Sequence, residues 1–115
     1  MVLGIKSRGH PRAKVKWPVH IHTTRGSISG VTTNISTSGA HISCQEPSQV
    51  EGKLRVRIDV PHRRSLNIVA RVVWHTVTAT NESTPGFGIG VKFAHISPDD
   101  RQLLQGLLAK HLKRN

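Results

Sequence analysis

Hydrophobic and polar residues alternate along most of the chain, with the period of two that is typical of half-buried β-strands. This alternation predicts six short strands, the second of them over about residues 27–34. Turn signals recur at intervals of roughly 8–12 residues, which favours an antiparallel sandwich or barrel. The residues expected to face inward are Val15, Trp17, Val19 and Ile21, then Ala40, Ile42 and Cys44, then Leu54, Val56, Ile58 and Val60, then Leu66, Ile68, Ala70, Val72 and Trp74, and finally Phe87, Ile89, Val91 and Phe93.

The first predicted strand contains a proline, Pro18, among its polar positions. Proline has no backbone N–H to donate to a strand ladder, so it is normally confined to edges and irregular positions. We therefore expect this strand to lie at a sheet edge or to carry a bulge.

Residues 97–113 have the pattern of an amphipathic helix. Ser97 suits the N-cap and Pro98 the first helical position, while Asp99 and Asp100 suit the positive end of the helix dipole. An apolar stripe follows at helical spacing, made of Leu103, Leu104, Leu107, Leu108 and Leu112. We expect this stripe to pack against the sheet or to close one end of a barrel.

The charge balance is strongly basic: among 115 residues, 17 Lys and Arg face 6 Asp and Glu, a formal net charge of +11. This charge favours an anionic partner. With two Trp, two Phe and no Tyr, the chain offers few platforms for stacking single-stranded bases. No apolar run is long enough for a membrane span or a secretory signal. The length predicts one domain, and we expect a cytoplasmic protein.

Enzymatic and metal chemistry find little support in the sequence. No pair of acidic residues is placed for general acid–base work, so the protein is not expected to be an enzyme. His20 and His22 share a strand face, but no other ligand is placed to complete a zinc shell. The single cysteine, Cys44, is in register with inward-facing residues and is interpreted as a buried thiol. No cofactor or metal is expected.

Two arginines, Arg8 and Arg12, lie four residues apart in a polar segment before the first strand. This segment contains glycine and proline and offers nothing to a core, so we expect it to be mobile without a ligand. Each guanidinium presents a planar fork of donors, and two of them on a short arm can grip a phosphate and a purine edge.

A second polar cluster lies at the end of the second predicted strand, over residues 34–39. Asn34 and Ser36 are two apart and therefore lie on one side of an extended backbone, where their polar groups can converge on one ligand. Gly39 would allow either a positive φ or a close backbone approach in the following turn. An Asn-x-Ser-x-x-Gly string is more specific than the arginine pair.

In this order, the two motifs closely resemble the signature of the PilZ domain family, Arg-x-x-x-Arg followed by Asp/Asn-x-Ser-x-x-Gly. The resemblance covers about residues 8–108 and implies a six-stranded antiparallel β-barrel with a C-terminal helix. A single domain is then expected over residues 1–115, with a flexible ligand-binding arm at 1–13, the barrel at 14–96 and the helix at 97–113. The residues that carry the resemblance are Arg8 to Arg12, Asn34 to Ile42, Glu51-Gly52, Ala70 to Trp74 and Gly86 to Phe93.

The resemblance implies a receptor for the bacterial second messenger cyclic di-GMP. Arg8 and Arg12 would bind guanine and phosphate as the arm closes, Asn34 and Ser36 would meet the ligand from the barrel surface, and Gly39 would hold the turn. The signal would pass to an unidentified protein partner in trans, in motility, adhesion or biofilm control. Further candidate ligand contacts are Lys6, Ser7, His10, Ser38, Arg71 and Lys92.

One departure from the family pattern lies in the arm, where Gly9 stands in place of a second basic residue, so both one ligand and an intercalated pair stay open. For the outward-facing Lys53, Arg55 and Arg57 two interpretations stay open, an extension of the anionic site and a solvated face, of which the solvated face is favoured. The alternative function is a basic β-barrel adaptor or nucleic-acid-binding module that does not bind cyclic di-GMP. Of the anionic partners, nucleic acid is the less favoured because aromatic residues are so few.

Overall fold

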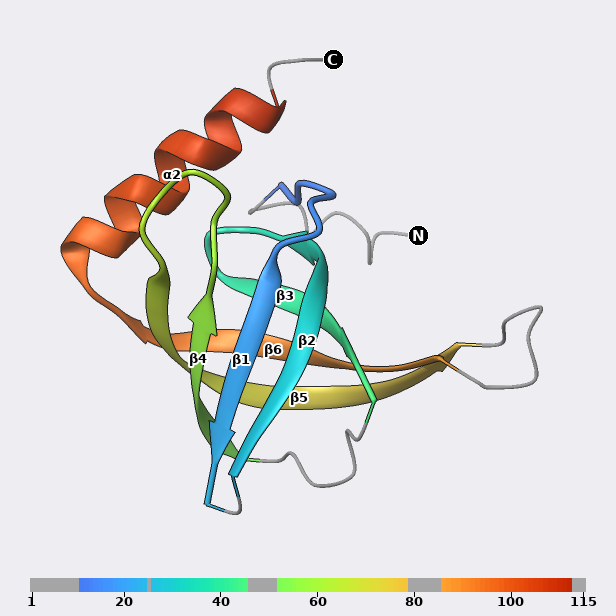
Figure 1. Ribbon diagram of the computed structural model, residues 1–115. Coiled ribbons are helices and arrows are strands. Elements are labelled where there is room, and N and C mark those ends of the chain that lie inside the picture. The colour runs from blue at the N-terminus through green and yellow to red at the C-terminus, as the bar shows by residue number, and fades with distance from the viewer. Residues whose placement is uncertain (1–10, 25, 46–51, 79–85, 113–115) are drawn as a thin grey trace.

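The six strands form a closed antiparallel barrel in the computed structural model, which describes residues 11–24, 26–45, 52–78 and 86–112 (Figure 1). The order around the barrel is β1-β2-β3-β6-β5-β4. This arrangement confirms the predicted fold, a six-stranded barrel with a C-terminal helix. The elements are β1 (Pro18–Thr23), β2 (Gly26–Ile35), β3 (Gly39–Cys44), β4 (Lys53–Ile58), β5 (Leu66–Thr78), β6 (Gly86–Ile96) and α2 (Pro98–Leu112).

The barrel interior is filled by the alternating aliphatic residues that the sequence pattern singled out. In β4, for example, Leu54, Val56 and Ile58 are buried and the intervening Lys53, Arg55 and Arg57 are exposed. Burial of one face of each strand fixes its register, since a slip of one residue would turn the charged set inward. The outer face of the barrel is therefore left to polar and charged side chains.

Pro18 does not mark an edge or a bulge, as its position suggested. β1 pairs with β2 on one side and with β4 on the other, in both cases without a register shift. Pro18 is the first residue of the strand, where its missing N–H removes little from the ladder. Its carbonyl oxygen accepts a hydrogen bond from the Asp59 amide at 2.8 Å.

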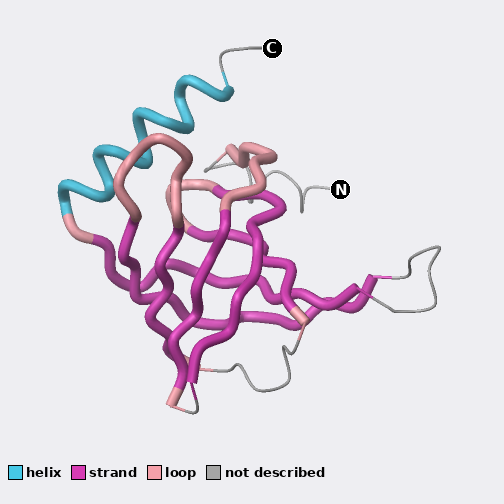
Figure 2. The backbone as a smooth tube through the Cα atoms, viewed as in Figure 1, coloured by secondary structure: helices cyan, strands magenta, loops and turns pink. Residues whose placement is uncertain are grey.

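Trp74 faces outward, not inward. The register of β5 against β6 shifts between Val72 and Trp74, so the extra residue, Val73, reverses the alternation from that point. The Trp74 side chain is 51% exposed. Beyond Arg71, the last residue of β5 that pairs with β4, β5 stays paired with β6, and past Gly88, where the pairing of β6 with β3 ends, the two strands extend as a two-stranded ribbon (Figure 2).

Helix α2 packs over the end of the barrel where β4 runs into β5 (Figure 1). Ser97 caps it as expected, accepting a hydrogen bond at Oγ from the Asp100 amide at 3.1 Å. Leu104 and Leu108 are buried against the core, and the remaining leucines of the stripe are partly buried against it. Asp100 is itself buried, pairs with Arg64 and accepts the Asn67 amide at 3.0 Å. Among the described residues, no helix has the length and apolarity to span a membrane.

Candidate ligand-binding site

The segment that precedes β1 is attached to β2 through backbone hydrogen bonds. The Ala13 amide donates to the Ile35 carbonyl at 2.9 Å, and the Ile35 amide donates back to Ala13 at 3.0 Å. Ala13 is 4% exposed and belongs to the hydrophobic core, although it was assigned to the flexible arm. Because of this pairing, the residue just before Ala13 lies beside the end of β2.

That residue is Arg12, and its guanidinium reaches the second motif. Arg12 donates from one terminal nitrogen to Asn34 Oδ1 at 2.6 Å, across 22 positions of sequence. The structure therefore brings Arg12 of the first motif together with Asn34 of the second. The other candidate residues of the arm, Arg8, Lys6, Ser7 and His10, lie outside the described residues.

The turn between β2 and β3 is held by Ser36. Its Oγ accepts a hydrogen bond from the Ser38 amide at 3.1 Å and lies 3.2 Å from Ser38 Oγ, and the Ser36 amide donates to the Gly39 carbonyl at 2.8 Å. Ser36 is fully buried, whereas Asn34 is only partly buried. The hydroxyl of Ser36 thus shapes the turn that presents Asn34, and its direct contact with a ligand stays a prediction.

Gly39 is required by a close backbone approach, the second of its two expected roles. Its φ is not positive, but a Cβ at this position would collide with the carbonyl oxygen of Val91 on β6. The Ser38 carbonyl next to it accepts the Phe93 amide at 2.8 Å. The turn is therefore fastened to β6, which gives Asn34 a rigid support.

His41 forms a polar bridge close to Arg12, although no role in the site was expected of it. Its Nδ1 lies 2.7 Å from Thr33 Oγ1 and its Nε2 lies 2.9 Å from Thr76 Oγ1. Burial lowers the pKa of His41, and the nearby positive charge of Arg12 lowers it further. A neutral imidazole at neutral pH therefore ties β2 to β5 under the candidate site.

A single row of residues crosses the outer surface from Asn34 to Trp74. Asn34 pairs with His41, His41 with Gly90, and Gly90 with Trp74. The indole covers Gly90 so closely that a Cβ there would overlap the ring. The alternating glycines of β6 therefore make room for side chains from neighbouring strands. Trp74, which the sequence pattern assigned to the core, presents an aromatic surface two strands away from His41.

Two of the further candidate contacts, Lys92 and Arg71, continue the neighbouring row. Lys92 pairs with Gly39 of the turn, and Arg71 pairs with Lys92. Both side chains are exposed. Lys92 is one strand away from the turn and Arg71 two, at strand spacings of about 4.8 Å. The row thus adds positive charge on one side of the Asn34 turn.

The two histidines considered as metal ligands have other partners. His20 Nε2 lies 3.1 Å from Asp59 Oδ2, and His22 Nδ1 lies 3.2 Å from Ser27 Oγ. Within the described part of the chain, no group of three or more His, Cys, Asp or Glu side chains is placed to hold a metal ion. Cys44 is buried as predicted, and this burial raises the pKa of its thiol.

The closed barrel, its C-terminal helix and the polar turn at Asn34 together define a β-barrel domain with a candidate ligand site on its outer wall. The model of the PilZ domain family matches residues 6–110. The chain belongs to the PilZ domain family. None of the curated proteins matches it in sequence.

Solved structures of PilZ proteins share the fold. The PilZ domain of YcgR from Escherichia coli, solved with c-di-GMP, matches with a TM-score of 0.76 at 9% identity, over 90% of this chain and 90% of that chain. The inhibitor of motility MotI (DgrA) from Bacillus subtilis matches with a TM-score of 0.73 at 20% identity, over 92% of this chain and 51% of its own.

PlzA from Borreliella burgdorferi, solved in complex with c-di-GMP, matches with a TM-score of 0.67 at 13% identity, over 97% of this chain and 55% of its own. The chain thus spans about half the length of MotI and PlzA. At these identities the similarity shows a shared fold.

Proposed function

We propose that this domain is a receptor for cyclic di-GMP, and that it binds the nucleotide between the arm carrying Arg8 and Arg12 and the turn carrying Asn34. The observation that carries the proposal is the hydrogen bond from Arg12 to Asn34 at 2.6 Å, which joins the two halves of the family signature. The c-di-GMP bound to the PilZ domain of YcgR and to PlzA supports the same ligand class.

The chemistry of the residues suits a guanine dinucleotide. Guanine presents O6 and N7 as adjacent acceptors, which an arginine fork meets with two parallel hydrogen bonds. Arg12 uses one terminal nitrogen on Asn34 in this structure, and its other N–H groups are directed to the ligand in the proposal. Asn34 offers both a donor and an acceptor, and Lys92 and Arg71 add attraction for the two phosphates. Ser36, Ser38 and Gly39 hold the turn.

Trp74 extends the site beyond the residues of the signature. Its half-exposed indole lies in the same cross-strand row as Asn34 and His41. An exposed aromatic face is suited to pack on a purine ring. We assign Trp74 to the apolar wall of the nucleotide site.

The output of this receptor is an interaction with a protein partner in trans. In the proposal, the nucleotide bridges the arm and the barrel, and the closed arm presents a changed surface to the partner. The name of MotI, an inhibitor of motility, supports motility as one process under such control; adhesion and biofilm formation are further candidates. The proposed role is binding without catalysis.

Isothermal titration tests the proposal directly, with cyclic di-GMP as ligand, cyclic di-AMP as control and salt at about 150 mM. Saturable heat with cyclic di-GMP alone is the expected result, and the stoichiometry separates one ligand from an intercalated pair. Equal heats from both nucleotides would mean a site that senses only charge. No heat from either nucleotide would contradict the proposal and favour the alternative function, a basic adaptor or nucleic-acid-binding barrel.

A further inference from the structure

A second positively charged surface lies on the barrel wall formed by β4, β5 and the neighbouring edge of β1. Strand pairing sets its side chains in two adjacent rows: Lys53 beside Arg71, and His22 beside Arg55. A third row places His20 beside Arg57 and Arg57 beside Asn67. Lys53, Arg55 and Arg57 are all exposed. We call the set His22, Lys53, Arg55, Arg57 and Arg71 the basic face.

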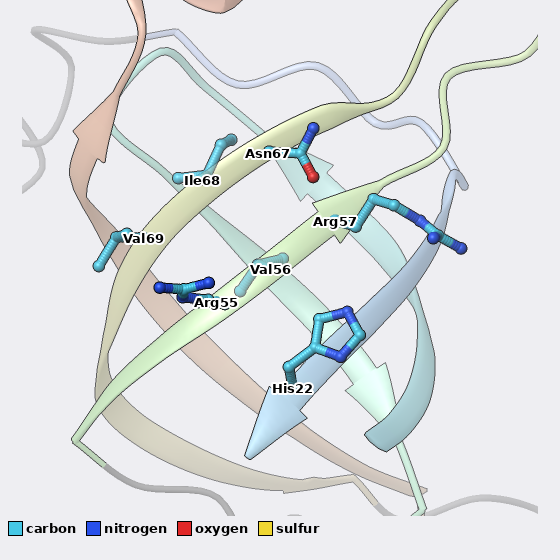
Figure 3. Close-up of a pocket in the computed structure, with 7 residues that line it drawn as sticks. All are labelled: His22, Arg55, Val56, Arg57, Asn67, Ile68 and Val69. Carbon is cyan, nitrogen blue, oxygen red and sulfur yellow. The ribbon is translucent and has the colours of Figure 1, made fainter. Parts of the chain in front are cut away.

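A groove of about 380 Å³ runs along this face between β4 and β5 (Figure 3). Its outward lining includes His22, Arg55, Arg57 and Asn67, and the core residues Val56 and Ile68 form its floor. Figure 3 shows Arg55 and His22 on neighbouring strands at one end, with Arg57 and Asn67 at the other. Donor groups thus border the hollow along its length.

Most of this charge is uncompensated. Asp59 pairs with one residue of the groove: it accepts a hydrogen bond from Ser65 Oγ at 2.7 Å and lies 3.1 Å from His20 and 3.2 Å from Arg57. Among the described residues, no acidic side chain forms an ion pair with Lys53, Arg55 or Arg71. Three fixed positive charges are therefore available to an anionic partner.

The composition of the basic face indicates which anion. Cores of protein–protein interfaces are depleted of charged residues and rich in aromatic ones, whereas nucleic-acid interfaces are polar and strongly positive. Apart from Val69, the outward lining of the groove is polar or charged. It holds no aromatic ring besides the imidazole of His22 within the described residues, so stacking on single-stranded bases is not favoured.

We propose that the basic face binds the phosphate backbone of double-stranded nucleic acid, without reading its sequence. This reverses the expectation that nucleic acid is a disfavoured partner, which rested on the low aromatic content and applies to single strands only. Alternate residues of β4 place charges about 6.7 Å apart along the strand, and neighbouring strands add charges about 4.8 Å to the side. Sites of this kind bind through release of condensed counterions.

The proposal shares Arg71 with the proposed nucleotide site but otherwise uses a different part of the wall, so its test replaces Lys53 and Arg55 and leaves Arg71 in place. Three phosphate contacts by Lys53, Arg55 and Arg71 predict a slope of about −2.7 in the logarithm of affinity against the logarithm of salt concentration. Two duplexes of unrelated sequence should bind with the same affinity and the same slope.

The test is fluorescence anisotropy with labelled DNA duplexes of about 20 base pairs, titrated with the full chain between roughly 50 and 200 mM salt. Lys53→Gln combined with Arg55→Gln should lower affinity at least tenfold and reduce the slope by about 2. The matched control is Arg63→Gln combined with Arg101→Gln, which removes the same charge from exposed positions elsewhere. It should retain affinity within about twofold, since both residues lie outside the basic face.

Three results would overturn the proposal: no duplex binding at the lowest salt, an equal loss in the control variant, or binding of polyglutamate in place of DNA at this face. Equal loss would mean that net charge alone attracts DNA, and polyglutamate binding would identify an acidic protein segment as the occupant. Titration of the Lys53/Arg55 variant with cyclic di-GMP separates this proposal from the proposed function, because its outcome depends on the arm and the Asn34 turn.

Discussion

The contact between Arg12 and Asn34 ties the chemistry of the proposed site to one side-chain pair. A charged donor on a neutral amide oxygen is a stronger hydrogen bond than a neutral pair, and in this structure it holds the guanidinium against the barrel wall. Asn34 is itself held by the turn that Ser36 and Gly39 stabilise. An arginine positioned in this way loses less side-chain entropy when it meets a ligand than a free one does.

Replacement of Arg12 should therefore weaken cyclic di-GMP binding more than the removal of another positive charge nearby. We expect Arg12→Ala to raise Kd at least tenfold, because a hydrogen bond to a charged group contributes about 1.5–3 kcal/mol and about 1.4 kcal/mol corresponds to a factor of ten. Arg12→Lys should recover little of the loss, since an ammonium cannot present the planar fork.

The control for this prediction is Lys14→Ala, which removes one positive charge from an exposed position two residues away. Isothermal titration of the three variants is the measurement. If Lys14→Ala weakened binding as much as Arg12→Ala, the site would depend on local positive potential and not on the geometry of Arg12.

At the scale of the elements, the junction between β3 and β6 supports the turn. Gly39→Ala should destabilise the fold by about 1–3 kcal/mol, as overpacking commonly does, because its new methyl group would meet the Val91 carbonyl, a backbone atom that cannot rotate away. The measurement is urea unfolding followed by circular dichroism.

Gly106→Ala is the matched control, with the opposite expected sign. Gly106 lies exposed within α2, and a Cβ there meets no atom within 4 Å. Alanine should stabilise the protein by about 0.5–1 kcal/mol because it favours helical backbone over the unfolded chain. A Gly39→Ala protein as stable as the parent would mean that β3 and β6 separate without cost.

The strands were predictable because a barrel has one interior, and each strand directs every second side chain into it. The same logic failed at Trp74, where one extra residue, Val73, reverses the alternation within a run of three apolar residues, and such a run does not show which of its members faces inward. The helix was predictable in detail, since Ser97, Pro98 and the leucine stripe each carry a local signal. Local sequence signals thus located the strands and the helix, but they did not reveal the bulge at Val73.

The candidate site was predictable in part. The family signature selected Arg12, Asn34 and Gly39. In the structure, Arg12 donates a hydrogen bond to Asn34, and Gly39 allows the close approach of the turn to β6. His41 and Trp74 lie within stretches that carry the family resemblance, but the sequence assigned them no role in the site, because their place in one row with Asn34 follows from the pairing of β2, β3, β6 and β5. The burial of Ser36 was hidden for the same reason. Periodicity identifies a face of a strand, and only register shows which residues on that face are neighbours.

For the whole molecule, strand register connects the two charged regions. One row runs from Gly39 through Lys92 and Arg71 to Lys53, so it begins at the turn of the proposed nucleotide site and ends on the basic face. Its length is about three strand spacings of 4.8 Å, or roughly 14 Å, which exceeds the Debye length of about 10 Å at 0.1 M salt. At that salt concentration an anion at one end is therefore largely screened from the other end.

The pH dependence of stability should show two separate declines. The pKa of His41 is lowered in the folded protein, so the unfolded chain binds a proton more readily and stability falls as the pH drops below about 6.5. The pKa of Asp59 is lowered by the hydrogen bond from Ser65, then by Arg57 and His20, so its contribution is lost only below about pH 3.9.

Thermal unfolding at a series of pH values measures both declines. His41→Gln should flatten the decline between pH 7.5 and 5.5, whereas His95→Gln, an exposed residue of β6, should leave it unchanged; the range is set by the ordinary histidine pKa of about 6.5. An unaltered profile in His41→Gln would show that the bridge between Thr33 and Thr76 does not control this transition.

The two tryptophans of the chain occupy contrasting environments, and this gives the protein its own optical reporters. Trp17 is 5% exposed, with its ring 6.1 Å from His111 near the end of α2, while Trp74 is 51% exposed beside the proposed nucleotide site. Collisional quenchers in solution reach Trp74 and spare Trp17. Replacing either indole with phenylalanine would leave a single emitter, one that follows occupancy of the outer wall or one that follows release of the helix. Ligand binding and helix docking can thus be observed separately without an added dye.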